Sequence, residues 1–197
     1  MLAPAFADPV RASQAVFRAV MDAMARPGAI VATGGLARAP QPLGLAAAAV
    51  ALTLTDYETP VWLDPALAQS PEIAAWLRFH TGAPLTDDPR QAAFGFVADP
   101  PRMPQFEAFS QGSMEYPDRA ATLVLQIGRL SDNGGFCLSG PGIRGSRALL
   151  ASPLPADFAA RMRANRALFP RGLDIILASD TMLAALPRSV HVAAEQS

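Results

Sequence analysis

The sequence has 197 residues, of which 51% are hydrophobic and 17% are charged, and its formal net charge is −1. A chain of this size can bury about 70% of its unfolded surface without a metal or a disulfide, so we expect one globular domain over residues 1–197. The balanced charge and the absence of a basic run exclude a surface that binds nucleic acid by neutralising phosphates.

Capping signals and periodicity predict the elements of the first half of the chain. A helix should begin after the N-cap Asp8 and end at Pro27-Gly28. We expect its core-facing side to carry Val10, Phe17, Val20, Met21 and Met24. Further along we expect a strand at 29–32, a buried alanine-rich helix at 43–54, a strand at 59–64 and a helix at 71–80.

The second half is predicted to continue the alternation. We expect a strand at 92–99, a short helix at 103–111, strands at 121–130 and 134–140 that the turn SDNGG joins into a hairpin, a helix at 155–170, a central strand at 173–179, a short helix at 180–187 and a last strand at 190–194. Helices that alternate with strands, plus one hairpin, predict an α/β fold with three layers, αβα, around a mixed sheet.

All sixteen basic residues are arginine, and the sequence contains no lysine. Without a lysine amine, neither a Schiff base to pyridoxal phosphate nor a P-loop contact to a nucleotide phosphate can form. The one cysteine, Cys137, lies in the apolar run FCL, where we expect a small buried side chain. The two histidines are far apart and belong to no metal-binding motif, so we predict neither a metal nor a cofactor.

The N-terminal residues and the longest apolar run indicate where in the cell the protein is found. The N-terminal residues have neither the positive charge nor the apolar core of a signal peptide. The longest apolar run, 43–54, is far shorter than the roughly 20 residues that a membrane-spanning helix needs. We therefore expect a cytoplasmic protein that does not enter the membrane.

Both histidines have an arginine close by in the sequence. Arg78 precedes His80 in WLRFHTGAPL, and Arg188 precedes His191 in PRSVHV. Arginine offers two parallel donors to phosphate or phosphonate oxygens, so the two pairs are candidates for an anion site. The alternative is structural, because cations are favoured in the last turn of a helix and a histidine can be a satisfied core residue.

The loop SGPGIRG, residues 139–145, is a second candidate for anion binding. The backbone N–H groups of Ser139, Gly140 and Gly142 could surround an anion, and Arg144 could add a positive charge. The alternative is a tight turn that needs glycine for its backbone angles.

Three acidic residues are considered for a chemical or structural role. Asp56 and Glu58 stand two residues apart and could form a carboxylate pair, or else belong to a solvated turn. Asp174 begins an apolar strand, and a buried carboxylate there would need a partner such as an arginine. Taken alone, the residues define no recognisable catalytic set.

Blocks spread over nearly the whole chain resemble one family in their order. They are FRAVMDAMARPG (17–28), LTLTDYETPVWL (52–63), LRFHTGAPL (77–85), ATLVLQIGRL (121–130), LSGPGI (138–143), FPRGLDIIL (169–177) and PRSVHV (187–192). The sequence thereby resembles the PhnH family, the H subunit of the bacterial carbon–phosphorus lyase system, as a single PhnH-like domain.

This resemblance implies a reduced version of the fold of pyridoxal-phosphate-dependent transferases, without the cofactor site. It implies a homodimer that assembles with the G, I and J subunits into a core complex. That complex supports formation of ribose 1-alkylphosphonate 5-triphosphate from ATP and an alkylphosphonate, and this subunit would not be catalytic by itself.

Two alternatives stay open beside that interpretation. The chain could be a stand-alone enzyme for a phosphorylated molecule, with His80 or His191 as acid/base, or a module that senses a phosphonate or nucleotide. Under the family interpretation, we expect Arg78, His80, Arg188 and His191 to help line a cleft near the dimer interface that suits phosphorylated ligands.

Overall fold

The computed structural model describes residues 5–194. Its α-helices are α1 (Pro9–Ala25), α2 (Leu45–Leu54), α3 (Pro65–Ala68), α4 (Pro71–Thr81) and α5 (Phe158–Ala167). Its strands are β1 (Val31–Ala32), β2 (Val61–Leu63), β3 (Phe94–Val97), β4 (Thr122–Gln126), β5 (Arg129–Ser139), β6 (Arg147–Ser152), β7 (Asp174–Ser179), β8 (Met182–Leu186) and β9 (His191–Ala194). No helix among these residues is both long enough and apolar enough to cross a membrane.

The main sheet is mixed, as the sequence predicts. Its six strands lie in the order β1-β8-β7-β4-β3-β2. The strands β2, β3, β4 and β7 are parallel to one another, whereas β8 is antiparallel to β7 and β1 is antiparallel to β8. A second, three-stranded antiparallel sheet has the order β6-β5-β9.

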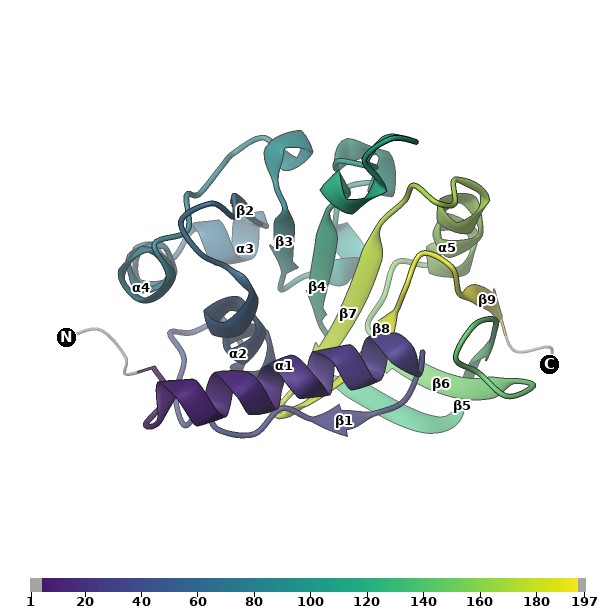
Figure 1. Cartoon of the computed structure of the whole chain (residues 1–197), viewed down its shortest axis with the longest axis horizontal. Coiled ribbons are helices and arrows are strands. Elements are labelled where there is room, and N and C mark those ends of the chain that lie inside the picture. The colour runs from purple at the N-terminus through teal and green to yellow at the C-terminus, as the bar shows by residue number, and fades with distance from the viewer. Residues whose placement is uncertain (1–4, 195–197) are drawn as a thin grey trace.

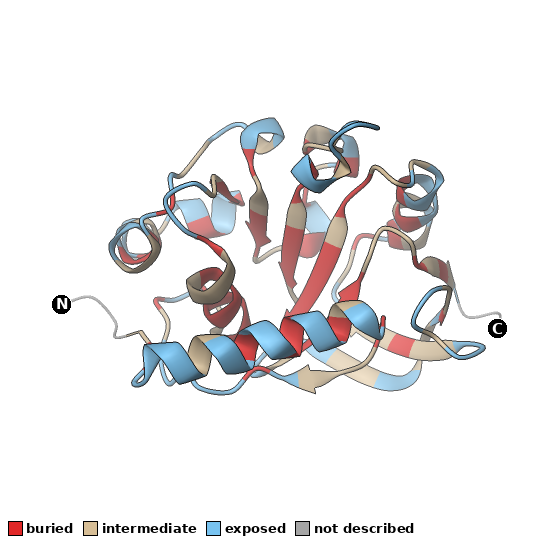
Figure 2. Cartoon of the chain, in the orientation of Figure 1, coloured by how far each residue is buried: buried red, intermediate tan, exposed pale blue. Residues whose placement is uncertain are grey.

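Helices and the small sheet lie on either side of the main sheet (Figure 1), and a hydrophobic cluster fills the space on each side. One cluster joins α1, α2 and α4 to the face that carries Val124 and Ile176. The other joins α5, short 3₁₀ segments and the small sheet to the face that carries Leu123 and Ile175. Neighbouring residues of β4 and β7 thus serve opposite faces, and both strands are largely buried in Figure 2. The layer opposite α1 therefore contains a sheet as well as helices.

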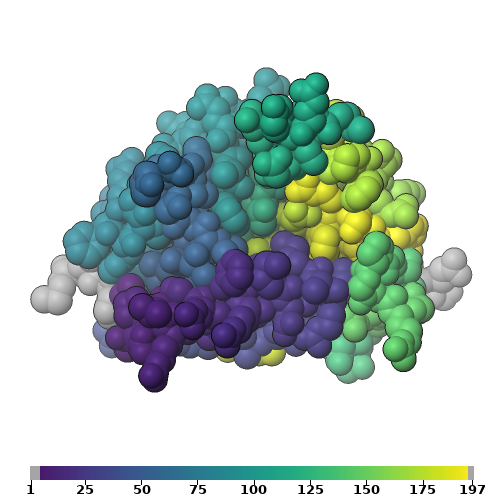
Figure 3. All heavy atoms as spheres, in the orientation of Figure 1, coloured from purple at the N-terminus to yellow at the C-terminus, as the bar shows by residue number. Residues whose placement is uncertain are grey.

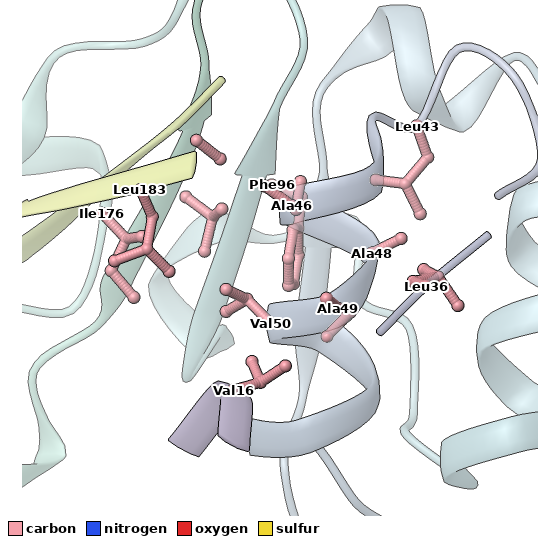
Figure 4. Close-up of a cluster of buried hydrophobic side chains, with 14 of the residues drawn as sticks. Val16, Leu36, Leu43, Ala46, Ala48, Ala49, Val50, Phe96, Ile176 and Leu183 are labelled. Atoms are coloured by element: carbon pink, nitrogen blue, oxygen red, sulfur yellow. The ribbon is translucent and has the colours of Figure 1, made fainter. Parts of the chain in front are cut away.

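The core of the first layer is α2, which contributes almost only methyl groups. Ala46 to Ala51 are all at most 1% exposed. Figure 4 shows Ala46, Ala48, Ala49 and Val50 of α2 in one cluster with Phe96 and Ile176 of the sheet and Val16 of α1. Because alanine side chains are short, helix and sheet can approach closely, and the expected buried alanine-rich helix is confirmed.

The predicted hairpin between 121–130 and 134–140 is wrong. β4 lies between β3 and β7 in the main sheet, while β5 belongs to the small sheet. The stretch SDNGG lies inside β5, with an irregularity between Ser131 and Phe136, and β5 pairs with β6 and β9. The apolar run of β4 suits the interior of a parallel sheet, whereas β5 has an exposed side. The strand β6 was not predicted.

The predicted helix at 180–187 is also wrong. Its residues form β8, which pairs with β7 from Ser179↔Met182 to Ile175↔Leu186. Leu and Ala favour helices in isolation, but here the open side of β7 offers backbone hydrogen bonds and a buried position to each residue. The helix expected at 103–111 is reduced to a single 3₁₀ turn at Phe106–Ala108.

The buried side of α1 differs from the expected one. Val10, Phe17 and Met21 are each at least 50% exposed. Val20 is buried as predicted and Met24 is partly buried against the core, but the other core-facing residues are Val16, Ala19 and Ala23. Small side chains such as Ala19 and Ala23 occupy the core-facing positions because α1 packs closely on the alanines of α2.

Cys137 is exposed, so the predicted burial of this side chain is wrong. It lies on β5, where the next residue, Leu138, points into the core and is fully buried. Successive side chains of a strand face opposite sides, which places the thiol on the outer face of the small sheet.

Replacing Ala49, which is fully buried in α2, with leucine should lower the free energy of unfolding by about 1–3 kcal/mol, because the added carbons have no space. Ala15→Leu, at an exposed position of α1, is the matched control and should change stability by less than about 0.5 kcal/mol. Urea denaturation of the two variants would measure this, and equal stabilities would contradict the close packing of α2.

Candidate functional site

The glycine loop, residues 139–145, connects β5 to β6 and lies against two other segments. Ser139 is the cross-strand partner of His191, and a side chain at Gly140 would contact Ser189. Gly142 adopts φ 79° and would collide with the carbonyl of Ala25 if it carried a Cβ. The structure thus brings Ser139, Gly140 and His191 together. Packing requires glycine at 142, whereas Gly140 is favoured by its backbone angle, φ 129°.

Arg144 and Arg147 follow each other closely in the sequence but have different surroundings. Arg147 donates from Nη1 to the carbonyl oxygens of Arg26 (3.1 Å) and Pro27 (2.9 Å), just beyond the end of α1. Arg144 is exposed on the glycine loop. Sequence reasoning missed Arg147, although Pro27-Gly28 already indicated a helix end with carbonyls that need donors.

Arg188 is the centre of a clamp that ties three segments together. Its Nη2 and Nε donate to the two carboxylate oxygens of Asp174 at 2.6 and 3.2 Å, and its backbone N–H donates to the same carboxylate at 2.8 Å. Its Nη1 donates to the carbonyls of Pro117 (2.6 Å) and Pro170 (3.3 Å). The expected arginine partner of Asp174 is therefore confirmed. All three guanidinium nitrogens already have acceptors within the protein.

Asp64 is a buried carboxylate that sequence reasoning missed. It is 2% exposed and accepts from the backbone N–H of Leu67 (2.9 Å), Ala98 (2.8 Å) and Asp99 (2.9 Å). It therefore caps α3 and holds the chain beyond β3. The signal was present in the sequence, because an aspartate followed by Pro65 is a typical start of a helix.

Arg78 and His80 lie in the last turn of α4, as predicted. The His80 ring stands edge-on to Trp76 and Phe79, with ring centroids 5.1 and 4.9 Å away. Arg78 instead lines a pocket of about 240 Å³ beside β2.

The expected cleft of four residues does not form within one chain. Figure 1 shows α4, with Arg78 and His80, at one end of the molecule. β9, which begins at His191, lies near the other end, and Arg188 precedes it.

The two carboxylates with shifted pKa values have local partners. The Thr59 hydroxyl, and then the backbone N–H of Glu58, lower the pKa of Asp56. Chiefly through its hydrogen bond from Arg161, Asp157 also has a lowered pKa. Asp56 thus belongs to a solvated turn and not to a carboxylate pair. Among residues 5–194, no three His, Cys, Asp or Glu side chains gather closely enough to hold a metal ion.

Fold and site together define a mixed-sheet α/β protein in which the carboxylates of Asp64 and Asp174 hold its own segments in place. The family model described as bacterial phosphonate metabolism protein (PhnH) matches residues 4–193. The chain belongs to the PhnH family.

Two relatives illustrate the similarity. The chain is 44% identical over 191 residues to the alpha-D-ribose 1-methylphosphonate 5-triphosphate synthase subunit PhnH of Rhizobium meliloti (strain 1021), covering 97% of this chain and 95% of that protein. It is 35% identical over 81 residues to the putative C-P lyase subunit protein HtxG of Stutzerimonas stutzeri, covering 41% of this chain and 42% of that protein.

Replacing Arg188 with alanine should lower the free energy of unfolding by about 3 kcal/mol, because Asp174 would stay partly buried without its counter-charge. Arg188→Lys should recover little, since an ammonium cannot span two carboxylate oxygens and two carbonyls. Arg163→Ala, at an exposed position of α5, is the control. Denaturant unfolding measures all three, and an Arg188→Ala variant as stable as the parent would refute the clamp.

Proposed function

We propose that this chain is the H subunit of the carbon–phosphorus lyase core complex, which degrades organic phosphonates. In this role it supports formation of ribose 1-alkylphosphonate 5-triphosphate from ATP and an alkylphosphonate. The observation that carries the proposal is the 44% identity over 97% of the chain to a protein named as a subunit of the 1-methylphosphonate 5-triphosphate synthase. Identity at this level over full length supports a shared role.

The chain itself would be an accessory subunit without catalysis of its own. The carboxylate of Asp64 accepts hydrogen bonds from three backbone N–H groups, and that of Asp174 accepts from Arg188, so both serve structural roles. The ring of His80 is packed between aromatic neighbours. These surroundings favour the subunit role over a stand-alone enzyme that uses His80 as acid/base.

We further propose a homodimer that assembles with the G, I and J subunits. An exposed apolar surface supports such contacts, because water-exposed aromatic and aliphatic side chains gain from being covered. The exposed large hydrophobic side chains on the helical side are Val10, Phe17, Met21, Tyr57 and Phe79. Figure 3 shows α1, which carries three of them, as an outer surface along one side of the molecule.

We propose that residues 1–197 act as one PhnH-like domain in the cytoplasm. The reduced transferase-like fold without a cofactor site is supported by the mixed sheet between two covering layers and by the absence of lysine from the sequence.

Co-expression with the G, I and J subunits of the same organism, followed by light-scattering mass of the purified material, tests the proposal. We expect a stable assembly that contains this chain, with the free chain as a dimer. A chain that never joins the other subunits would refute the subunit role. Turnover of a phosphorylated metabolite by the purified chain alone would instead favour the stand-alone enzyme.

A further inference from the structure

A small pocket lies beside the outer edge of the main sheet. The chain returns along β2 after α4, so that Val61 N–H donates to the Pro84 carbonyl (2.8 Å) and Thr86 N–H donates to the Val61 carbonyl (3.0 Å). This places Leu85 next to Val61 in a parallel bridge. The pocket, of about 240 Å³, is lined by Val61, Leu63, Ala68, Ala74, Arg78, Leu85, Thr86 and Asp87.

The floor of the pocket is apolar and its position is fixed. Val61 and Leu63 belong to the buried edge strand, and Leu67 and Ile73 beneath the adjoining helices are fully buried. Ala74 stands one turn before Arg78 on the same side of α4, and its short side chain leaves room in front of the guanidinium. A short aliphatic group would therefore meet apolar surface here.

Two opposite charges share this pocket without neutralising each other. Arg78 and Asp87 are both exposed and both line the pocket. Among the described residues, neither side chain forms an ion pair or a hydrogen bond, although Arg11, Arg26, Arg102, Arg161 and Arg188 all pair with nearby aspartates. Both charged groups are thus open to a ligand.

Asp87 is held in place by its neighbours in the chain. The Thr86 hydroxyl accepts a hydrogen bond from the Asp88 backbone N–H at 3.2 Å, and the Asp88 carboxylate accepts from the Arg90 backbone N–H at 3.0 Å. These hydrogen bonds order the backbone on both sides of Asp87, whose side chain lines the pocket.

We propose that this pocket binds a small zwitterion. The guanidinium of Arg78 takes an oxyacid group through two parallel hydrogen bonds, and the carboxylate of Asp87 takes a primary ammonium group. A short aliphatic linker lies on Leu63 and Leu85. The pocket volume of about 240 Å³ leaves room for a small molecule and favours a short linker between the two charged groups. The inference rests on the proposed function only for the choice of a phosphonate among the oxyacid probes.

Isothermal titration of the full chain tests the inference with 2-aminoethylphosphonate, methylphosphonate, ethylamine and β-alanine. We expect 2-aminoethylphosphonate to bind at least about tenfold more tightly than methylphosphonate or ethylamine, because only the zwitterion engages both charges. Equal affinities for 2-aminoethylphosphonate and methylphosphonate, or no saturable binding of any probe, would overturn the proposal. β-Alanine distinguishes the oxyacids, since equally tight binding would mean that a carboxylate serves as well as a phosphonate.

Two variants assign the charges. Arg78→Gln should weaken binding of 2-aminoethylphosphonate and of methylphosphonate, each about tenfold, whereas Asp87→Asn should weaken only the former. The controls are Arg163→Gln on α5 and Asp132→Asn on β5, both at exposed positions. All four should unfold at the parent temperature, because no hydrogen bond of the fold is lost. Variants at 78 and 87 that bind like the parent would place the ligand elsewhere.

The outcome can be separated from that of the subunit role. A chain that joins the other subunits but binds no zwitterion would overturn this inference alone. A chain that binds 2-aminoethylphosphonate through Arg78 and Asp87 but never assembles would overturn only the proposed subunit role.

Discussion

The structure depends on the burial of α2, a helix without a polar side. Ala46 to Ala51 are almost completely covered, so the rest of the fold must enclose this helix from every direction. The main sheet covers it on one side, and α1 and α4 contact it on the others. Its short side chains let α1 approach with Ala19 and Ala23, which turns Phe17 and Met21 outward. The exposed apolar surface on α1 is thus a consequence of the core.

Arginine side chains hold the surrounding loops in place through hydrogen bonds to backbone carbonyls. Arg147 satisfies carbonyls after α1, and Arg188 joins the start of β7 to two neighbouring loops. A planar group with several donors can bridge such acceptors, which an ammonium cannot. Against these structural arginines, Arg78 is distinguished by an open guanidinium beside an apolar pocket. Arg147 and Arg188 thus stabilise the fold, whereas the guanidinium of Arg78 is accessible to a ligand.

Membership of the PhnH family and the exposed apolar side chains are consistent with each other. A relative that covers nearly the whole chain is named as a subunit, and a subunit needs surfaces for its partners. The helical side offers exposed apolar side chains, while the small sheet adds a second outer face on which Cys137 and His191 lie. The pocket lies beside β2, at the opposite end of the molecule from the small sheet.

The sequence by itself determined the elements whose signals are local. The cap at Asp8, the alanine run of α2, the end of α4 at Gly82 and the need of Asp174 for a cation were all predictable, because each depends on neighbouring residues or on the cost of burying a charge. The class of fold followed from their order. Only the tertiary structure decided that Met182–Leu186 is a strand, that β4 and β5 belong to different sheets, and that Arg78 and Arg188 lie far apart. Strand pairing and the meeting of distant side chains are set by long-range packing, which competes with local preference and leaves no mark on a short stretch of sequence.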